Sequence, residues 1–380
     1  MYRVIAALAA AFTAAIVLAG LTGHAGTQSI NTEQYSLRVV TVAKGLDEPW
    51  SLAWLPDGRM LVTEKPGRMR IVAKDGRLSK PVKGVPKVVD TGQGGLLDVI
   101  LDPKFATNKK IYFSYSELGP GGQGTAVASA TLDGLKLTDT KVLFRQTPKS
   151  GGGRHYGGRL VIARDGTLFI TVGDRGQRDK VQNKKINRGQ VIRIHTDGSI
   201  PDDNPFVGKK GFRPETWSHG HRNPQGAALH PETGKLWVHE HGPAGGDEVN
   251  VVGAGRNYGW PVIGYGKHYS GAKVGVGTKK PGMEQPVHYW DPSIAPSGMA
   301  FYTGDKFPKW KGNLLVGALG HQTVVRLILD GEKVVGQERI LDDLGERIRD
   351  VRMGPDGYVY LLTDDNDGRI LRLEPTRSSS

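Results

Sequence analysis

One histidine stands in an unusual setting, in the segment GGGRHYGGRL at residues 151–160. Five glycines surround His155, and an arginine lies on each side of it, at positions 154 and 159. A neutral imidazole can take a proton from a hydroxyl group at physiological pH, because its pKa is near neutrality. Glycine backbone lets a ligand approach closely. The segment therefore makes His155 a candidate for proton transfer. The alternative is a loop histidine that only hydrogen-bonds to the backbone.

Two arginines, Arg347 and Arg349, alternate in the segment RIRDV. In an extended strand their side chains face the same way. Like charges on one face repel each other unless an anion lies between them, and guanidinium groups match carboxylates in a bidentate manner. The spacing therefore predicts an anion-binding pair, and two solvated surface arginines are the alternative.

Two pairs of histidines follow the pattern His-x-His, in SHGH and in HEH. In an extended chain each pair shares one face, and four histidines could bind zinc or copper. That interpretation would indicate a metal-dependent hydrolase of the lactonase type. It involves His219, His221, His239 and His241.

The elements that must position these side chains are suggested by a repeat. A short apolar strand, a turn rich in Asp, Gly or Pro, and a second alternating strand recur along the chain. The copies begin near positions 52, 99, 160, 227, 299 and 351. Repeated antiparallel units without helical periodicity predict an all-β, six-bladed β-propeller over residues 37–375, with its site in loops at one end of the central channel. We expect residues just after an inner strand to point into that site. The alternative fold is a β-sandwich.

The N-terminal segment and the net charge indicate where the protein acts and which partners it can bind. The chain has 380 residues, a net charge of +13 and no cysteine. Residues 1–25 have the pattern of a cleaved signal peptide, which predicts a secreted, periplasmic protein with no membrane span. Residues 26–36 are then a lead-in, and residues 376–380 a tail. No block of five basic residues occurs, so we expect no nucleic-acid partner.

Eight short motifs occur in one order: QGG, HYGGRL, GHRNPQG, EHGP, GDEVN, NYGWP, SGMAFY and RIRDV. This order resembles the soluble aldose (glucose/sorbosone-type) sugar dehydrogenases, over about residues 37–375. The resemblance implies pyrroloquinoline quinone (PQQ) and Ca²⁺ as cofactors. It further implies oxidation of aldoses at the anomeric carbon to lactones, with electrons passing to an external acceptor. We expect a monomer or a homodimer. A non-catalytic extracellular binding propeller is the alternative from a different class.

The resemblance also assigns roles to residues. His155 matches the general base, and Arg222 matches the residue that stabilises negative charge on the quinone. The implied cofactor contacts are Gln93, Arg222, Asn223, Tyr269, Ala318, Leu319, Gly320, Arg347, Ile348 and Arg349. The implied calcium ligands are Gly242 and Pro243 through their carbonyl groups, and, for a structural ion, Glu248 and Tyr258.

The sequence departs from the family's pattern in three places. Some members carry a lysine that faces PQQ where this chain has Gly320 and His321, so His321 could replace that contact. Arg154 stands where some members have Asp or Asn, and Arg175 where some have Gln. At these three positions the cofactor contacts and the sugar preference do not follow from the family's pattern. A solvated acidic turn remains the alternative for Asp247 and Glu248.

Overall fold

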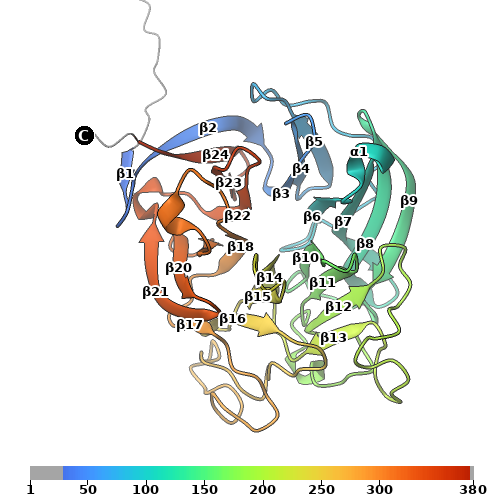
Figure 1. Cartoon of the computed structure of the whole chain (residues 1–380). Coiled ribbons are helices and arrows are strands. Elements are labelled where there is room, and N and C mark those ends of the chain that lie inside the picture. Colours follow the sequence, from blue (N-terminus) through green and yellow to red (C-terminus); the bar gives the residue numbers. More distant parts are fainter. Residues whose placement is uncertain (1–28, 377–380) are drawn as a thin grey trace, which may run out of the picture.

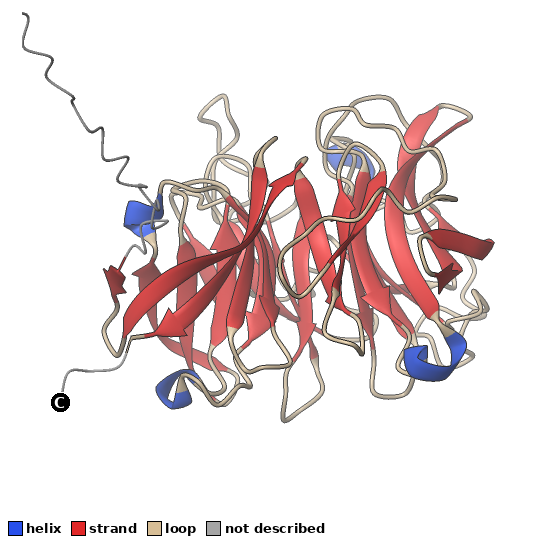
Figure 2. Ribbon diagram, turned by 90° about the horizontal axis from the view of Figure 1, so that it is seen from above, coloured by secondary structure: helices blue, strands red, loops and turns tan. Residues whose placement is uncertain are grey.

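The computed structural model describes residues 29–376. The predicted signal peptide, residues 1–25, lies outside this range. In the described residues, six antiparallel sheets stand around a common centre as blades (Figure 1). Seen from above, the strands run between two faces that carry the connecting loops (Figure 2). The prediction of a six-bladed β-propeller is confirmed.

Five of the six blades are meanders in which consecutive strands pair, and the last blade combines strands from both ends of the described chain. The first three sheets consist of β3 (Pro49–Trp54), β4 (Met60–Glu64) and β5 (Arg68–Val72); β6 (Leu96–Leu101), β7 (Lys110–Gly119), β8 (Gly122–Asp133) and β9 (Lys136–Arg145); and β10 (Gly157–Ile162), β11 (Leu168–Val172), β12 (Gln190–Ile194) and β13 (Thr216–His219). The next two consist of β14 (Pro224–Leu229), β15 (Leu236–Glu240), β16 (Asp247–Val252) and β17 (His288–Trp290); and β18 (Pro296–Phe301), β19 (Leu314–Ala318), β20 (Val324–Asp330) and β21 (Lys333–Ile340). The last sheet has the order β1 (Ser29–Asn31), β2 (Ser36–Leu46), β24 (Gly368–Pro375), β23 (Val359–Thr363) and β22 (Ile348–Met353).

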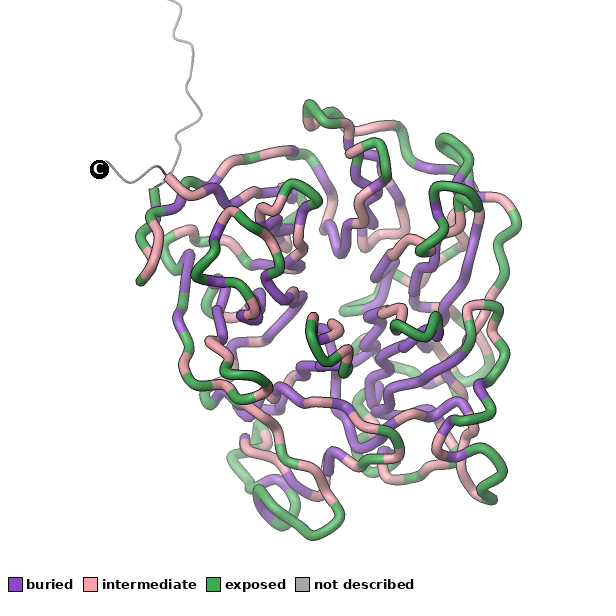
Figure 3. The backbone as a smooth tube through the Cα atoms, in the orientation of Figure 1, coloured by how far each residue is buried: buried purple, intermediate pink, exposed green. Residues whose placement is uncertain are grey.

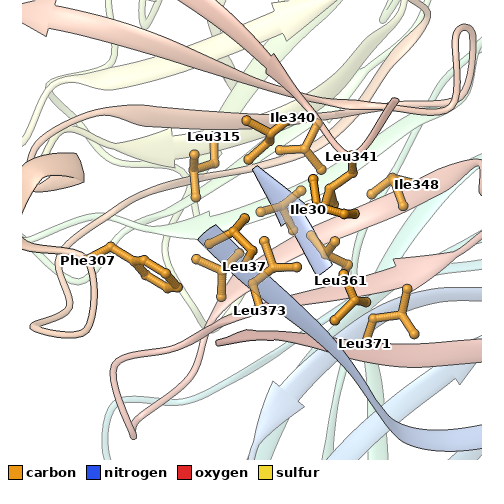
Figure 4. Close-up of a cluster of buried hydrophobic side chains, with 14 of the residues drawn as sticks. Ile30, Leu37, Phe307, Leu315, Ile340, Leu341, Ile348, Leu361, Leu371 and Leu373 are labelled. Carbon is orange, nitrogen blue, oxygen red and sulfur yellow. The ribbon is translucent and has the colours of Figure 1, made fainter. Parts of the chain in front are cut away.

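The last sheet closes the ring, because it joins the two ends of the described chain. Strand β2 pairs with β24 from Leu37↔Pro375 to Leu46↔Gly368. Ile30 of β1 and Leu37 of β2 pack into one apolar cluster with Leu371 and Leu373 of β24 (Figure 4). Strand β1 lies inside the segment that we predicted to be a lead-in, so the sheet begins before residue 37.

The second strand is buried on both faces in five of the six blades, and in the remaining blade β7 is buried from Ile111 to Ser116. Strands β4, β11, β15, β19 and β23 are buried at every residue. They lie between neighbouring strands of their own sheet and between neighbouring sheets (Figure 3). Exposed residues gather in the connecting loops. The propeller is therefore held by apolar contacts between blades, which fits a chain without cysteine.

All six innermost strands share an irregularity. The pairing of each with its neighbour shifts near its first residue, in β3, β6, β10, β14, β18 and β22. A β-bulge redirects side chains and is common next to active sites. Here the inner strands begin, and the second strands end, at the same end of the propeller. The predicted site residues His155 and Arg222 precede the inner strands β10 and β14 instead of following an inner strand as we expected, and both line a cavity at this end.

The few helices of the described residues lie in loops: α1 (Phe105–Asn108) and three short 3₁₀ turns, η1 (Arg178–Lys180), η2 (Pro308–Trp310) and η3 (Asp342–Leu344). Between residues 29 and 376, no helix has the length and apolar character that a membrane span requires.

Candidate active site

His155 lies in the wall of a cavity of about 210 Å³ at the end of the propeller where the inner strands begin. The lining comes from loops of different blades: Arg154, His155, Asp174, Gly176, Arg178, Arg222, Pro243, Trp260, His268 and Tyr269. His155 itself is buried and has a φ of 57°, an uncommon conformation for a residue other than glycine. Such backbone strain occurs preferentially at functional sites.

The imidazole of His155 is held by Asp174. Its Nδ1 lies 2.7 Å from Oδ1 of Asp174, and Nε1 of Trp260 donates to the second oxygen at 2.9 Å. A carboxylate only accepts hydrogen bonds, so Nδ1 carries the proton and Nε2 keeps a free lone pair. Burial lowers the pKa of His155 below 6.5, although the hydrogen bond to Asp174 acts in the opposite direction. The geometry therefore provides a neutral base at neutral pH.

The chain around His155 is fixed by close backbone packing. Gly173, just after β11, lies so near that a Cβ atom there would collide with the carbonyl oxygen of His155. The backbone N–H of His155 donates to Oε1 of Gln93 at 2.7 Å. The guanidinium of Arg175 stacks 3.4 Å from the ring centre of Tyr156 and donates to the carbonyl oxygens of Gly152 and Arg154. The glycine-rich loop is thus rigidly supported.

Arg222 lies at the boundary between this cavity and a second, much smaller one. Its backbone N–H donates to Glu240, its Nη1 donates to the carbonyl oxygen of His241 at 3.1 Å, and its guanidinium lies 5.4 Å from the ring centre of Trp260. The next residue, Asn223, accepts from the N–H of Gly157, but its buried Nδ2 has no hydrogen-bond partner among residues 29–376. A buried amide without a partner is costly unless a ligand satisfies it.

A third cavity, of about 230 Å³, adjoins the same region and contains the arginine pair. Its lining includes Trp50, Gln93, Gln225, Leu319, Arg347 and Arg349. Both arginines form ion pairs with Asp364, at 2.8 Å from Arg347 and 2.7 Å from Arg349. The anion between them in this structure is therefore a carboxylate of the protein itself. Both side chains nevertheless line the cavity, which leaves their predicted role open.

The remaining predicted cofactor contacts are less well placed. Leu319 lines the cavity of the arginine pair, whereas Ala318, Gly320 and Ile348 line none of the described cavities. The N–H groups of residues 318–320 already pair with Thr323, Ala295 and Ile294. Tyr269 lies at the rim of the His155 cavity and is 78% exposed. His321 is exposed, and it lines neither the His155 cavity nor the cavity of the arginine pair.

All four residues of the predicted calcium sites line one small cavity. Gly242, Pro243, Glu248 and Tyr258 share it with Glu240 and Arg222, and its volume is about 20 Å³. This is close to the space that a single water molecule or ion requires. A Cβ atom on Gly242 would collide with the carbonyl oxygen of Gly245, so only glycine fits there. Burial and the nearby Glu240 carboxylate raise the pKa of Glu248 to about 8. This oxygen-rich set suits calcium.

The two acidic residues after the Gly-Pro turn are not a solvated pair. Asp247 is fully buried and accepts from the N–H groups of Gly242, Ile294 and Ala295. Glu248 is half-buried. Asp247 therefore ties the Gly242 loop to the segment before β18.

The four histidines of the His-x-His pairs do not converge on a metal. His221 lies between Ser218 (2.9 Å) and Glu240 (2.8 Å), and Nε2 of His241 donates to the carbonyl oxygen of Pro296 at 2.6 Å. Within residues 29–376, no group of three or more His, Asp or Glu side chains could hold a metal ion. Nothing in the described residues therefore favours the metal-dependent hydrolase.

Charged side chains also fill the channel below the cavities. Asp98 and Asp350 alternate with Arg159 and Arg352, at 2.7–3.3 Å between their charged atoms. The Arg159 guanidinium lies 4.3 Å from the ring centre of Trp50, which lines the cavity of the arginine pair. The site thus rests on a buried ionic network.

Several of these partners were missed by the sequence reasoning, namely Asp174, Trp260, Asp364 and Glu240. Asp174 and Asp364 each follow the second strand of a blade, after β11 and β23. That recurring position was a usable signal, because second strands end beside the site. Trp260 lies in the long connection between β16 and β17 and carried no such signal.

Comparisons with known proteins agree on one family. The sequence profile described as "Glucose / Sorbosone dehydrogenase" matches residues 46–372. The chain is 48% identical to aldose sugar dehydrogenase YliI of Escherichia coli K12 over 346 residues, which is 90% of this chain and 93% of that protein.

Solved structures give the same result. The apo-form of the soluble aldose sugar dehydrogenase from Escherichia coli is 48% identical and superposes with a TM-score of 0.88, over 90% of this chain and 100% of that one. The PQQ-bound form of aldose sugar dehydrogenase from Streptomyces coelicolor is 29% identical, with a TM-score of 0.75, over 90% and 98%.

Proposed function

Because the chain belongs to the glucose/sorbosone dehydrogenase family, we propose that it oxidises aldoses at the anomeric carbon to lactones. The cofactors in this proposal are PQQ and calcium, and an external acceptor takes up the electrons. The predicted signal peptide supports action outside the cytoplasm, in the periplasm. The observation that carries the proposal is the pair His155–Asp174 in the wall of a cavity next to Arg222.

Residues of the 230 Å³ cavity fit PQQ, which carries three carboxylates. Its wall carries Lys65, Arg347 and Arg349, and it also carries Glu48 and Asp364, which form ion pairs with them. Nearby, the buried Nδ2 of Asn223 has no hydrogen-bond acceptor in the described part of the chain, and a ligand oxygen would supply one. The relatives support this assignment, since one of them is described in its PQQ-bound form. When bound, PQQ would supply the two-electron oxidation that no side chain can perform.

The small cavity fits calcium. Its residues present a carboxylate, Glu248, and a loop in which Gly242 and Pro243 can offer carbonyl oxygens. Burial, with the neighbouring carboxylates of Glu240 and Asp247, raises the pKa of Glu248, and a bound cation would favour its charged form. A bound calcium ion would supply a fixed positive charge beside Arg222.

The protein's own residues would carry the proton transfer. Nε2 of His155 takes the proton from the hydroxyl group on the anomeric carbon. Asp174 holds the ring in the required tautomer and stabilises the imidazolium that forms, as an orienting carboxylate does in catalytic triads. Trp260 keeps Asp174 in place through the hydrogen bond to its second oxygen. Arg222 stabilises negative charge that develops beside it.

The test uses purified protein to which PQQ and calcium are added, with aldoses and an artificial electron acceptor. We expect turnover by the wild type and a loss of about 10²–10⁴ in rate for His155→Gln, with PQQ still bound. The matched control is His195→Gln, since His195 is an exposed histidine just after β12, at the opposite end of its blade. Absence of turnover with every aldose would overturn the proposal. Equal rates for His155→Gln and wild type would show that His155 is not the general base.

A further inference from the structure

The cavity of His155 is unusually rich in arginine. Arg154, Arg178 and Arg222 all line it, and Asp174 is the one carboxylate among its lining residues in the described chain. Asp174 is already engaged by His155, by Trp260 and by the N–H of Gly176. The protein therefore offers this cavity an excess of positive charge.

Two further arginines, Arg175 and Arg188, stand behind the cavity wall, and within the described residues neither forms an ion pair with a carboxylate. Arg175 donates to backbone carbonyl groups and stacks on Tyr156. Arg188 is fully buried and donates to the carbonyl oxygens of Asn187 and Pro148 and to Gln177. Burial, together with the charge of Arg175, lowers the pKa of Arg188 to about 10. These buried charges add to the positive potential, because low-dielectric walls focus a field into a cleft.

The two outer arginines are free to take a ligand. Arg154 is exposed and lies across Gly176, with its Nε 2.8 Å from where a Cβ atom would stand on that glycine. Among residues 29–376, no carboxylate lies within ion-pair distance of Arg154. Arg178 contacts His268 at 3.1 Å and the carboxylate of Asp179 at 3.5 Å. That carboxylate is 89% exposed, and exposed ion pairs contribute little.

The cofactor's own carboxylates do not account for these outer arginines. In the proposed function, the carboxylates of PQQ pair with Lys65, Arg347 and Arg349, which line a different cavity. Arg154 and Arg178 line the cavity into which His155 opens, where the sugar would lie. Guanidinium groups bind carboxylate and phosphate in a planar, bidentate manner.

We propose that the preferred substrate is an aldose with an anionic group, a carboxylate or a phosphate, away from its anomeric carbon. Arg154 and Arg178 bind that group while the anomeric hydroxyl lies at Nε2 of His155. This inference rests on the proposed function and deepens it, because it names the substrate class.

The experiment compares matched sugars with the PQQ- and calcium-loaded enzyme and an uncharged electron acceptor. Glucose is paired with glucuronate and with glucose 6-phosphate, and galactose with galacturonate. We expect kcat/KM for a charged sugar to exceed that of its neutral counterpart by about 10- to 100-fold. The ratio of kcat/KM for the charged sugar to that for the neutral sugar should fall as the salt concentration rises from about 0.05 to 0.5 M. Salt shortens the Debye length and therefore screens the attraction between the arginines and the anionic group. The comparison of glucuronate with glucose 6-phosphate identifies which anion is bound.

Variants separate this inference from the proposed function. Arg154→Gln and Arg178→Gln should each lower the charged-to-neutral ratio at least fivefold, and Arg154→Lys should restore part of it. Arg77→Gln removes the same charge at the opposite end of a blade, where the side chain is 84% exposed, and should leave the ratio unchanged. Melting temperatures verify that the variants fold.

Turnover of neutral sugars without any preference for charged ones would overturn the inference and leave the proposed function intact. A preference that Arg154→Gln and Arg178→Gln both retain would also overturn it. Failure of every sugar, neutral or charged, would instead overturn the proposed function.

Discussion

The Nδ1 atom of His155 lies 2.7 Å from Oδ1 of Asp174. His155 precedes β10 and Asp174 follows β11, so the two loops meet because these strands are antiparallel neighbours in one blade. Trp260, which holds the other oxygen of Asp174, comes from the long connection of the next blade. The orientation of the base thus depends on the packing of two adjacent blades.

The first prediction concerns Asp174→Asn. The amide cannot stabilise an imidazolium and permits the wrong tautomer, so we expect kcat to fall by about 10²–10⁴. The hydrogen bond to Asp174 raises the pKa of His155 against the lowering effect of burial. Its removal should therefore move the acid limb of the kcat/KM profile to lower pH. In the wild type this limb should already lie below pH 6.5.

The measurement is the pH dependence of kcat/KM between pH 4.5 and 8 at saturating PQQ and calcium. The control is Asp197→Asn, because Asp197 is exposed in the turn after β12. An acid limb at the same pH in Asp174→Asn and wild type would show that Asp174 does not control the protonation of His155.

The second prediction concerns the arginine pair. We expect the double variant Arg347→Ala/Arg349→Ala to bind PQQ more weakly by about 10- to 100-fold for each charge-assisted contact that is lost. Titration of the apo-protein with PQQ measures the affinity. The control, Arg339→Ala, removes an arginine that is also paired with an aspartate but lies on the outer strand β21. An unchanged affinity would mean that the pair serves only to bind Asp364.

The sequence predicted the architecture well because its turn signals mark every blade. Each of the six copies of the repeat lies in a different sheet. The partners of the charged residues could not be predicted in the same way. Asp364 is 15 residues beyond Arg349, and in the sequence it resembles an ordinary turn aspartate. Only the antiparallel pairing of β22 with β23 places it next to Arg349. The same holds for Trp260 and Asp174, which are 86 residues apart.

The third prediction concerns calcium. A ligand that binds only the native state raises stability by mass action, so a chelator should lower the melting temperature of the PQQ-free protein by several degrees. Glu248→Gln should abolish that shift, because Glu248 lines the proposed ion site. Glu284→Gln, at an exposed ion pair with Arg256 in the same connection, should retain it. If a chelator inactivates the holoenzyme but leaves the apo-protein's melting temperature unchanged, the structural ion is excluded and a catalytic ion remains.

The last prediction concerns Asp98, the centre of the buried ionic network. Asp98 accepts from Ser51 at 2.6 Å and from the N–H of Leu160 at 2.8 Å, and it pairs with Arg159 and Arg352. Removal of one member of a buried ion pair leaves an uncompensated charge. We therefore expect Asp98→Asn to lower the free energy of unfolding by about 3–5 kcal/mol at pH 7, measured by urea denaturation. Burial alone would raise the pKa of Asp98, but Arg159 and Arg352 hold it below 3.8.

The lowered pKa of Asp98 determines the pH range in which Asp98→Asn lowers the free energy of unfolding. The contribution of Asp98 is complete above the unfolded-state pKa and is lost as the pH falls through the lower folded-state pKa. The difference between wild type and Asp98→Asn should thus persist down to about pH 4 and narrow only below it. Asp57→Asn, at an exposed pair with Arg59, should cost less than about 1 kcal/mol. A cost for Asp98→Asn as small as that of the control would show that apolar packing between the blades, rather than the ionic network, supports the floor of the site.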